Sequence, residues 1–171
     1  MSRKKLRIHN TKVDNLVSNL RGEIGEIIFT WVLLRNIIAE SQELAKSKSE
    51  YDFSDPHFAT LKIMIDKLSD EIVARLSELA ETKIGRLTFY FAHQKLNKFA
   101  EEVEDFSRFI RINRLEEKRN VNISHKELPE TQSEQKYIFI SYETLIKGLA
   151  KALRLMKKID FVMLGPSTKY L

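Results

Sequence analysis

A helical period in the apolar residues runs without a break through the first part of the chain. Apolar side chains recur there in steps of three and four, the spacing that places them on one face of an α-helix. The pattern predicts one long amphipathic helix over residues 12–46. The apolar positions are Val13, Leu16, Val17, Leu20, Ile24, Ile27, Ile28, Trp31, Leu34 and Ile38.

Three further segments repeat this period. The second helix is expected to begin at Pro56, since proline fits the first turn of a helix, and to continue to Leu79. The third covers residues 87–118, with a kink near Gly85, and the fourth covers residues 141–161. The chain of 171 residues contains only 5 Gly and 3 Pro, the residues that interrupt helices and form the tight turns between short strands. The sequence therefore predicts an all-α protein, an up-and-down four-helix bundle.

The same pattern defines one domain. We expect a basic N-terminal arm over residues 1–11, a single helical bundle over residues 12–164 and a short C-terminal tail over residues 165–171. A chain of this length, 43% apolar, can bury one substantial core. The residues expected in that core are Leu20, Ile27, Trp31, Leu68, Leu76, Phe99, Phe106 and Leu149.

The chain contains no cysteine. Disulfides, zinc–thiolate sites and thiol nucleophiles are thereby excluded, and a reducing compartment, the cytoplasm, is expected. The uncharged apolar run of the first helix extends only over residues 27–34, far short of the roughly 20 residues that a membrane span needs. His57 and His93 have no third ligand at a useful spacing, so we predict neither a metal site nor a cofactor.

The residues with the clearest chemistry follow the third helix. Arg119 and Asn120 are separated by four residues from His125. A guanidinium stays charged and can hold a phosphate through its fixed fork of donors. An imidazole can move protons near neutral pH. This combination is the minimum equipment for cutting RNA without a metal, and we expect both side chains at a surface cleft.

Positive charge concentrates around this motif. Six basic and two acidic residues lie between positions 106 and 126, a net of +4 in a chain whose total is +5. Such a surface suits a polyanion, because neutralised phosphates release counterions. The predicted substrate-binding residues are Arg111, Arg114, Lys118 and Lys126.

A second basic stripe is predicted on the last helix, where four cations follow one another at steps of four, three and four. They are Lys147, Lys151, Arg154 and Lys158. The alternative for both groups is an ordinary solvated face, since the helix macrodipole alone favours basic residues near helix C-termini.

The motif resembles the signature of the HEPN superfamily, the higher-eukaryote and prokaryote nucleotide-binding domains. That signature is an arginine, four to six residues and a histidine, commonly with a polar residue directly after the arginine, as Asn120 follows Arg119 here. Arg86 and His93 also fit the loose pattern, but they lie in an apolar helix and are interpreted as structural. The resemblance is to abortive-infection HEPN proteins and covers residues 13–161.

The resemblance implies a metal-independent endoribonuclease, a toxin or phage-defence effector with a possible antitoxin partner. Two motifs would meet across a homodimer interface and cut RNA by attack of a 2′-hydroxyl on its neighbouring phosphate. His125 would be the acid or base, Arg119 would hold the phosphate, and Asn120 would orient one of them. Some relatives carry a modified tyrosine two residues beyond the histidine, where this chain has Glu127.

Simpler interpretations remain open. Asn120 could cap the end of a helix and His125 could be a solvated loop residue, in a catalytically silent bundle that binds RNA or a protein. Glu23 and Glu26, within the first helix, are expected to be boundary carboxylates bonded to Arg21 or Lys12 rather than site acids.

Overall fold

The computed structural model describes residues 3–48, 54–82, 86–124 and 138–164, and helices make up nearly all of them. No strand occurs in these ranges. The prediction of an all-α protein is therefore confirmed for the described part of the chain. The elements are α1 (Arg3–Lys48), α2 (Pro56–Leu79), α3 (Phe89–Leu96), α4 (Ala100–Ile112), α5 (Leu115–Ser124) and α6 (Tyr142–Leu164).

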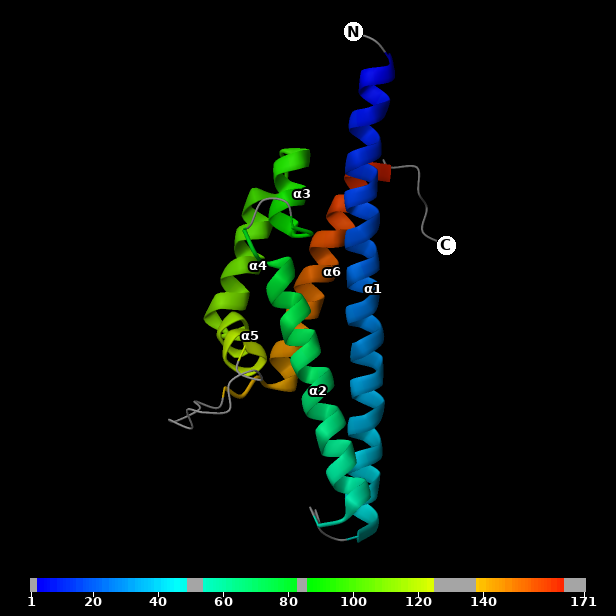
Figure 1. Cartoon of the computed structure of the whole chain (residues 1–171), viewed down its shortest axis with the longest axis vertical. Coiled ribbons are helices and arrows are strands. Elements are labelled where there is room, and N and C mark those ends of the chain that lie inside the picture. Colours follow the sequence, from blue (N-terminus) through cyan, green and yellow to red (C-terminus); the bar gives the residue numbers. More distant parts are fainter. Residues whose placement is uncertain (1–2, 49–53, 83–85, 125–137, 165–171) are drawn as a thin grey trace.

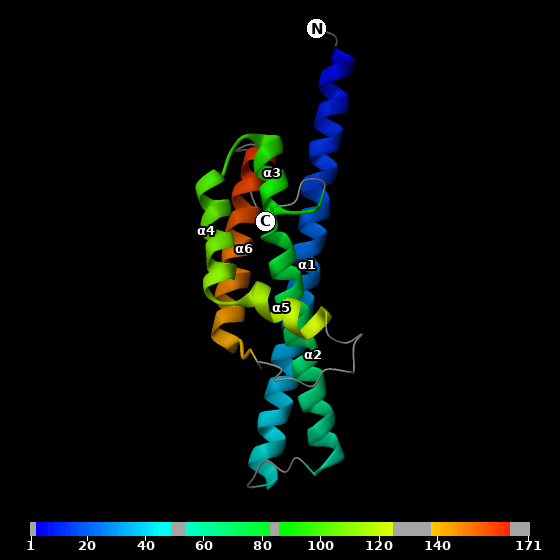
Figure 2. The same cartoon turned by 60° about the vertical axis from the view of Figure 1, so that its left-hand side comes forward.

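Four of these helices lie side by side and alternate in direction. α1 descends and α2 returns beside it, while α4 descends and α6 ascends between α4 and α1 (Figure 1). α3 is a short helix at the upper end, and α5 crosses the side of α2 below α4 (Figure 2). α5 is thus the one element that runs across the long helices, and it carries the Arg119–Asn120 pair.

The start of α2 follows the predicted signal. Asp55 has an extended backbone, and its side chain accepts hydrogen bonds from the amides of His57 and Phe58. Pro56 occupies the first helical turn. An N-cap carboxylate satisfies amides that have no partner within the helix, which fixes where the helix begins.

The beginning of α1 differs from the expectation. The helix starts at Arg3, so nearly all of the expected basic arm over residues 1–11 continues the helix. The side chains of residues 1–12 lie outside the described part.

The predicted third helix over residues 87–118 is wrong, because the chain turns twice within it. α3 ends at Asn97, which adopts a left-handed backbone with φ 52°, and α4 follows Phe99 with φ 71°. A second turn at Arg114, φ 60°, separates α4 from α5. α5 then continues to Ser124, beyond the expected helix end. The expected kink near Gly85 lies outside the described residues.

The core lies between α1, α2, α4 and α6 and is lined by the predicted apolar faces. Of the eight residues expected in it, five are buried: Leu20, Ile27, Leu76, Phe106 and Leu149. The other three, Trp31, Leu68 and Phe99, are only partly buried at its edge. Trp31 stacks on Tyr142 with ring centroids 4.4 Å apart, at the seam between α1 and α6.

α6 packs closely on its neighbours at Gly148. A Cβ at this position would lie 3.1 Å from Leu76 and 3.2 Å from Phe109. The absence of a side chain therefore allows α6 to approach α2 and α4. Within the described ranges, no helix is both long and apolar enough to cross a membrane.

Candidate functional site

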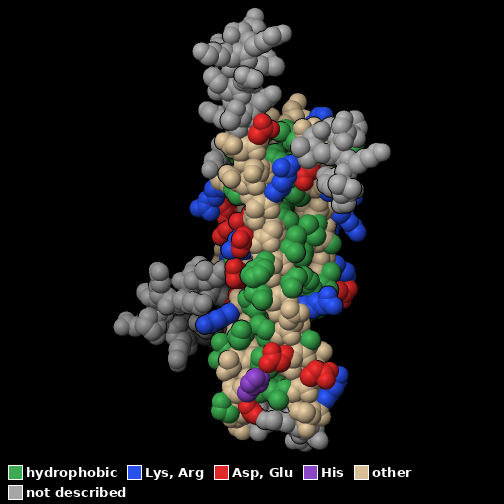
Figure 3. Space-filling view, turned by 90° about the vertical axis from the view of Figure 1, so that its right-hand side faces the viewer, with side chains coloured by type: hydrophobic (Ala, Val, Ile, Leu, Met, Phe, Trp, Pro, Cys, Tyr) green, Lys and Arg blue, Asp and Glu red, His purple; other side chains and the backbone are tan. Residues whose placement is uncertain are grey.

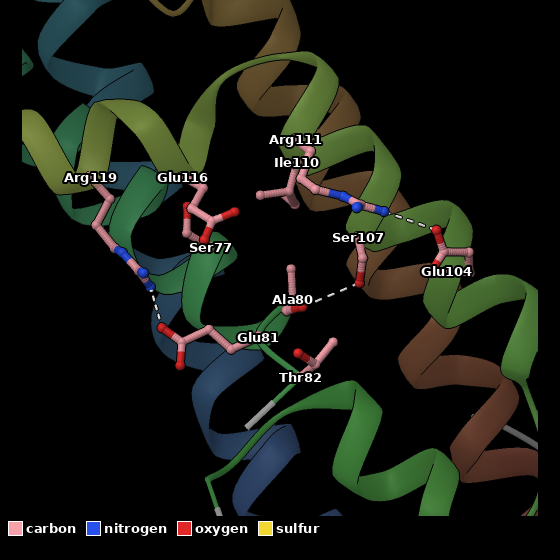
Figure 4. A pocket seen from close by; sticks show the side chains of 10 residues that line it. All are labelled: Ser77, Ala80, Glu81, Thr82, Glu104, Ser107, Ile110, Arg111, Glu116 and Arg119. Carbon is pink, nitrogen blue, oxygen red and sulfur yellow. Dashed lines mark hydrogen bonds and ion pairs between the residues drawn. The ribbon is translucent and has the colours of Figure 1, made fainter. Parts of the chain in front are cut away.

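A polar pocket lies where the end of α2, the middle of α4 and α5 meet, and Arg119 lines it (Figure 4). Its volume is about 280 Å³, close to the lower end of the range for small-molecule sites. The lining residues are Ser77, Ala80, Glu81, Thr82, Glu104, Ser107, Ile110, Arg111, Glu116 and Arg119. Three carboxylates and two guanidiniums thus share a small space, where the positive side chains compensate the negative ones.

Arg119 is held by Glu81, which follows the end of α2. Its Nη1 donates to Glu81 Oε1 at 2.7 Å, and the two side chains are only 17% and 9% exposed. The other oxygen of Glu81 accepts from Arg86 at 3.1 Å. Arg119 thus lies at a pocket, as expected, but its guanidinium is mostly buried and is already paired with Glu81.

Asn120 touches the opposite edge of the same guanidinium. Nε and Nη2 of Arg119 both lie 3.4 Å from Asn120 Oδ1, which is long for a hydrogen bond. Asn120 also lies well inside α5, which ends at Ser124. The alternative in which Asn120 caps the end of its helix does not fit this placement.

A second charged pair fixes α5 against α2. Lys118 Nζ lies 3.0 Å from Asp70 Oδ1, and its side chain is only 8% exposed. Leu115, at the start of α5, is fully buried. α5 is thus attached to the bundle by Leu115, Lys118 and Arg119. These contacts fix the orientation of the Arg119–Asn120 pair.

The residues predicted to bind substrate do not form one basic surface. Arg111 lines the pocket and pairs with Glu104 at 2.9 Å, while Arg114, in the turn before α5, pairs with Glu117 of α5. Lys118 is buried in its pair with Asp70. Of these three, only Arg111 joins Arg119 at the pocket. His125 and Lys126 lie outside the described residues.

The basic stripe of the last helix is largely neutralised. Lys151 and Lys158 of α6 pair with Asp105 and Glu102 of α4, and Lys147 pairs with Glu143 on its own helix. Hydrogen bonding to Lys158 lowers the pKa of Glu102 below its ordinary value. Lys151 and Lys158 of this stripe therefore form a charged seam between α4 and α6.

The other residues considered in the sequence have structural partners. Glu23 bonds Arg75 of α2 at 2.7 Å and Arg21 bonds Asp160 of α6, in place of the expected bond between Glu23 and Arg21, while the side chain of Lys12 lies outside the described part. His93 Nδ1 lies 2.7 Å from the carbonyl oxygen of Lys98, at the turn after α3. The described residues contain no group of three or more side chains that could hold a metal ion.

Among the pocket residues that the sequence did not indicate, Glu81 is the one that holds Arg119. It lies 38 positions from Arg119 in the chain. The apolar period carries no information about such a charge pair between distant segments. Comparison with family models, with curated proteins and with solved structures finds no match to this chain.

Proposed function

We propose that the chain is a metal-independent endoribonuclease with a HEPN-like bundle of four helices, a toxin or phage-defence effector that acts in the cytoplasm. Its site would combine Arg119, Asn120 and His125 from each of two copies. The observation that carries the proposal is the placement of Arg119 and Asn120 beside a polar pocket, with the guanidinium held by Glu81.

The geometry of Arg119 suits a phosphate-binding role. Glu81 accepts a hydrogen bond from one terminal nitrogen, Nη1, while the Nε and Nη2 edge makes, among the described residues, only the long contacts to Asn120. That edge presents two parallel donors, the arrangement that matches two oxygens of a phosphate. Glu81 would then act as a positioning residue that orients the edge.

In the proposed reaction the 2′-hydroxyl oxygen attacks the adjacent phosphorus and the bond from phosphorus to the 5′-oxygen breaks. His125 takes the proton from the 2′-hydroxyl or gives one to the leaving 5′-oxygen, and the equivalent group of the second copy performs the other transfer. Arg119 stabilises the charge that develops on the phosphate. The products are a 2′,3′-cyclic phosphate and a 5′-hydroxyl.

The test is cleavage of single-stranded RNA in the presence of EDTA. His125→Ala and Arg119→Lys are each expected to lower the rate about a hundredfold or more, because the lysine keeps the charge but loses the paired donors. Arg86→Lys is the matched control, since Arg86 also bonds Glu81 but lies outside the motif. The control is expected to cleave like the wild type.

Cleavage that survives His125→Ala, or that needs added magnesium, would overturn the mechanism. The second candidate, a silent helical bundle that binds RNA or a protein partner, would then be the better account. The ion pairs of Arg111, Arg114 and Lys118 leave less free positive charge for RNA than the sequence suggests, which favours the form of this candidate that binds a protein partner.

A further inference from the structure

One side of the molecule carries an apolar face that no described residue covers. It is formed by neighbouring parts of α1 and α6 and faces the viewer in Figure 3. We call it the α1–α6 face and define it by six exposed side chains: Ile28, Phe29 and Val32 of α1 and Tyr142, Ile146 and Leu153 of α6. Phe29 is 61% exposed.

The two helices are joined so that the six side chains form one surface. The stack of Trp31 on Tyr142 and the ion pair of Arg21 with Asp160 both tie α1 to α6. Burial in this seam, opposed by the charge of Arg35, raises the pKa of Tyr142 above its ordinary value. The face is therefore a fixed feature of the fold.

Two glycines of α1 lie beside this face. Gly22 and Gly25 precede Phe29 by seven and four residues, so they share its side of the helix. A Cβ at either position would meet nothing within 4 Å among the described residues. Glycine destabilises a helix interior relative to alanine, and nothing described in this copy requires it here. The close approach of another backbone would provide the reason.

The area of the face matches one side of a dimer interface. From the exposed fractions of the six side chains and typical side-chain areas, the face offers roughly 500 Å² of apolar surface. A standard interface buries about 800 Å² per partner, of which roughly 60% is apolar. The six side chains therefore supply about the apolar share that one partner needs.

We infer that the α1–α6 face binds the α1–α6 face of a second copy of this chain, related by a two-fold axis. Two antiparallel helices would then pack on two others, with Gly22 and Gly25 where the helices cross. α5, which carries Arg119, lies on nearly the opposite side, since Figure 2 looks onto α5 and Figure 3 looks onto the α1–α6 face. The contact is therefore additional to any pairing at the Arg119 site, and one does not block the other.

The test compares the light-scattering mass of wild type with that of Phe29→Asp and Gly25→Leu at micromolar concentration. Both variants are expected to lower the mass. If the Arg119 sites also pair, contacts on nearly opposite sides link copies into longer chains, which the variants reduce to dimers, and if they do not pair, a dimer becomes a monomer. Ile112→Asp is the control, because Ile112 is 72% exposed at the end of α4, outside the face, and this variant is expected to keep the wild-type mass.

Gly25→Leu separates lost association from misfolding. Leucine is a better helix former than glycine, so this variant is expected to keep the helical circular dichroism signal while the mass falls. A monomeric wild type, or an unchanged mass in Phe29→Asp, would overturn the inference. An unchanged mass in Gly25→Leu would do the same, since a close crossing cannot accept the larger side chain.

The result is independent of the ribonuclease proposal. The mass measurement needs no RNA. The proposed cleavage is measured separately, with the variants at Arg119 and His125. If no preparation cleaves RNA but Phe29→Asp still lowers the mass, the proposed function is wrong and the inferred contact is still supported.

Discussion

The Arg119 guanidinium neutralises a carboxylate that has almost no contact with water. Glu81 is 9% exposed, and it also bonds Arg86. Two charges in such a place attract each other strongly, but each has lost its hydration, so the net gain from the pair is small. Removal of one partner is far more costly than replacement of both, because the other buried charge then loses part of its compensation.

At the residue scale we predict that Arg119→Ala lowers the free energy of unfolding by about 3 kcal/mol, since Glu81 loses its main partner. The double change Arg119→Met with Glu81→Gln is expected to recover more than half of this loss. Urea denaturation followed by circular dichroism measures both.

Arg111→Ala is the control for this prediction. Arg111 and Glu104 are 60% and 56% exposed, and a pair so open to solvent contributes at most about 1 kcal/mol. Equal losses in Arg111→Ala and Arg119→Ala would show that the Glu81 pair behaves like a surface pair.

At the scale of the element, the chain changes direction where α3 ends. Asn97 adopts the left-handed conformation there, and its amide donates to the carbonyl oxygen of His93 at 2.7 Å. Asparagine and glycine accept this conformation more easily than other residues do. The residue type therefore helps to fix where α3 stops.

We predict that Asn97→Ala lowers the free energy of unfolding by about 1 kcal/mol, because the alanine Cβ crowds the following carbonyl in a left-handed residue. Asn97→Gly is the matched control and should keep the wild-type stability or exceed it slightly. Thermal melting of the three proteins checks the order. A melting temperature that is lower in the glycine variant than in the alanine variant would contradict the account.

The break at Asn97 also explains why the predicted third helix was wrong. Apolar residues continue at helical steps across it, from Leu96 through Phe99 to Val103. The spacing of the apolar residues indicates which of them face the core. It does not indicate whether the backbone between them stays helical. A short turn that returns the chain to the same core leaves the spacing unchanged.

At the scale of the whole molecule, the sequence predicted the parts that depend on local order. Most of the apolar face of α1, though not Ile28, the start of α2 at Pro56 and the all-helical fold of the described residues are confirmed. The surroundings of Arg119 were not predictable in this way, since Glu81 and Asp70 reach α5 from a distant part of the chain. Trp31 was misplaced because its spacing fits the buried stripe, while the seam with Tyr142 leaves one side open.

The narrow support of α5 has a consequence for hydrogen exchange. Leu115 is the one fully buried apolar side chain described in α5, and the two charged pairs to α2 add little net stability. Local opening of such an element needs far less free energy than global unfolding. The amides of residues 119–124 are therefore expected to exchange with deuterium faster than those of residues 72–79 in α2, as read from peptides by mass spectrometry. Equal protection of the two segments would contradict this. In the opened form Arg119 separates from Glu81, and its guanidinium reaches solvent with all of its donors available.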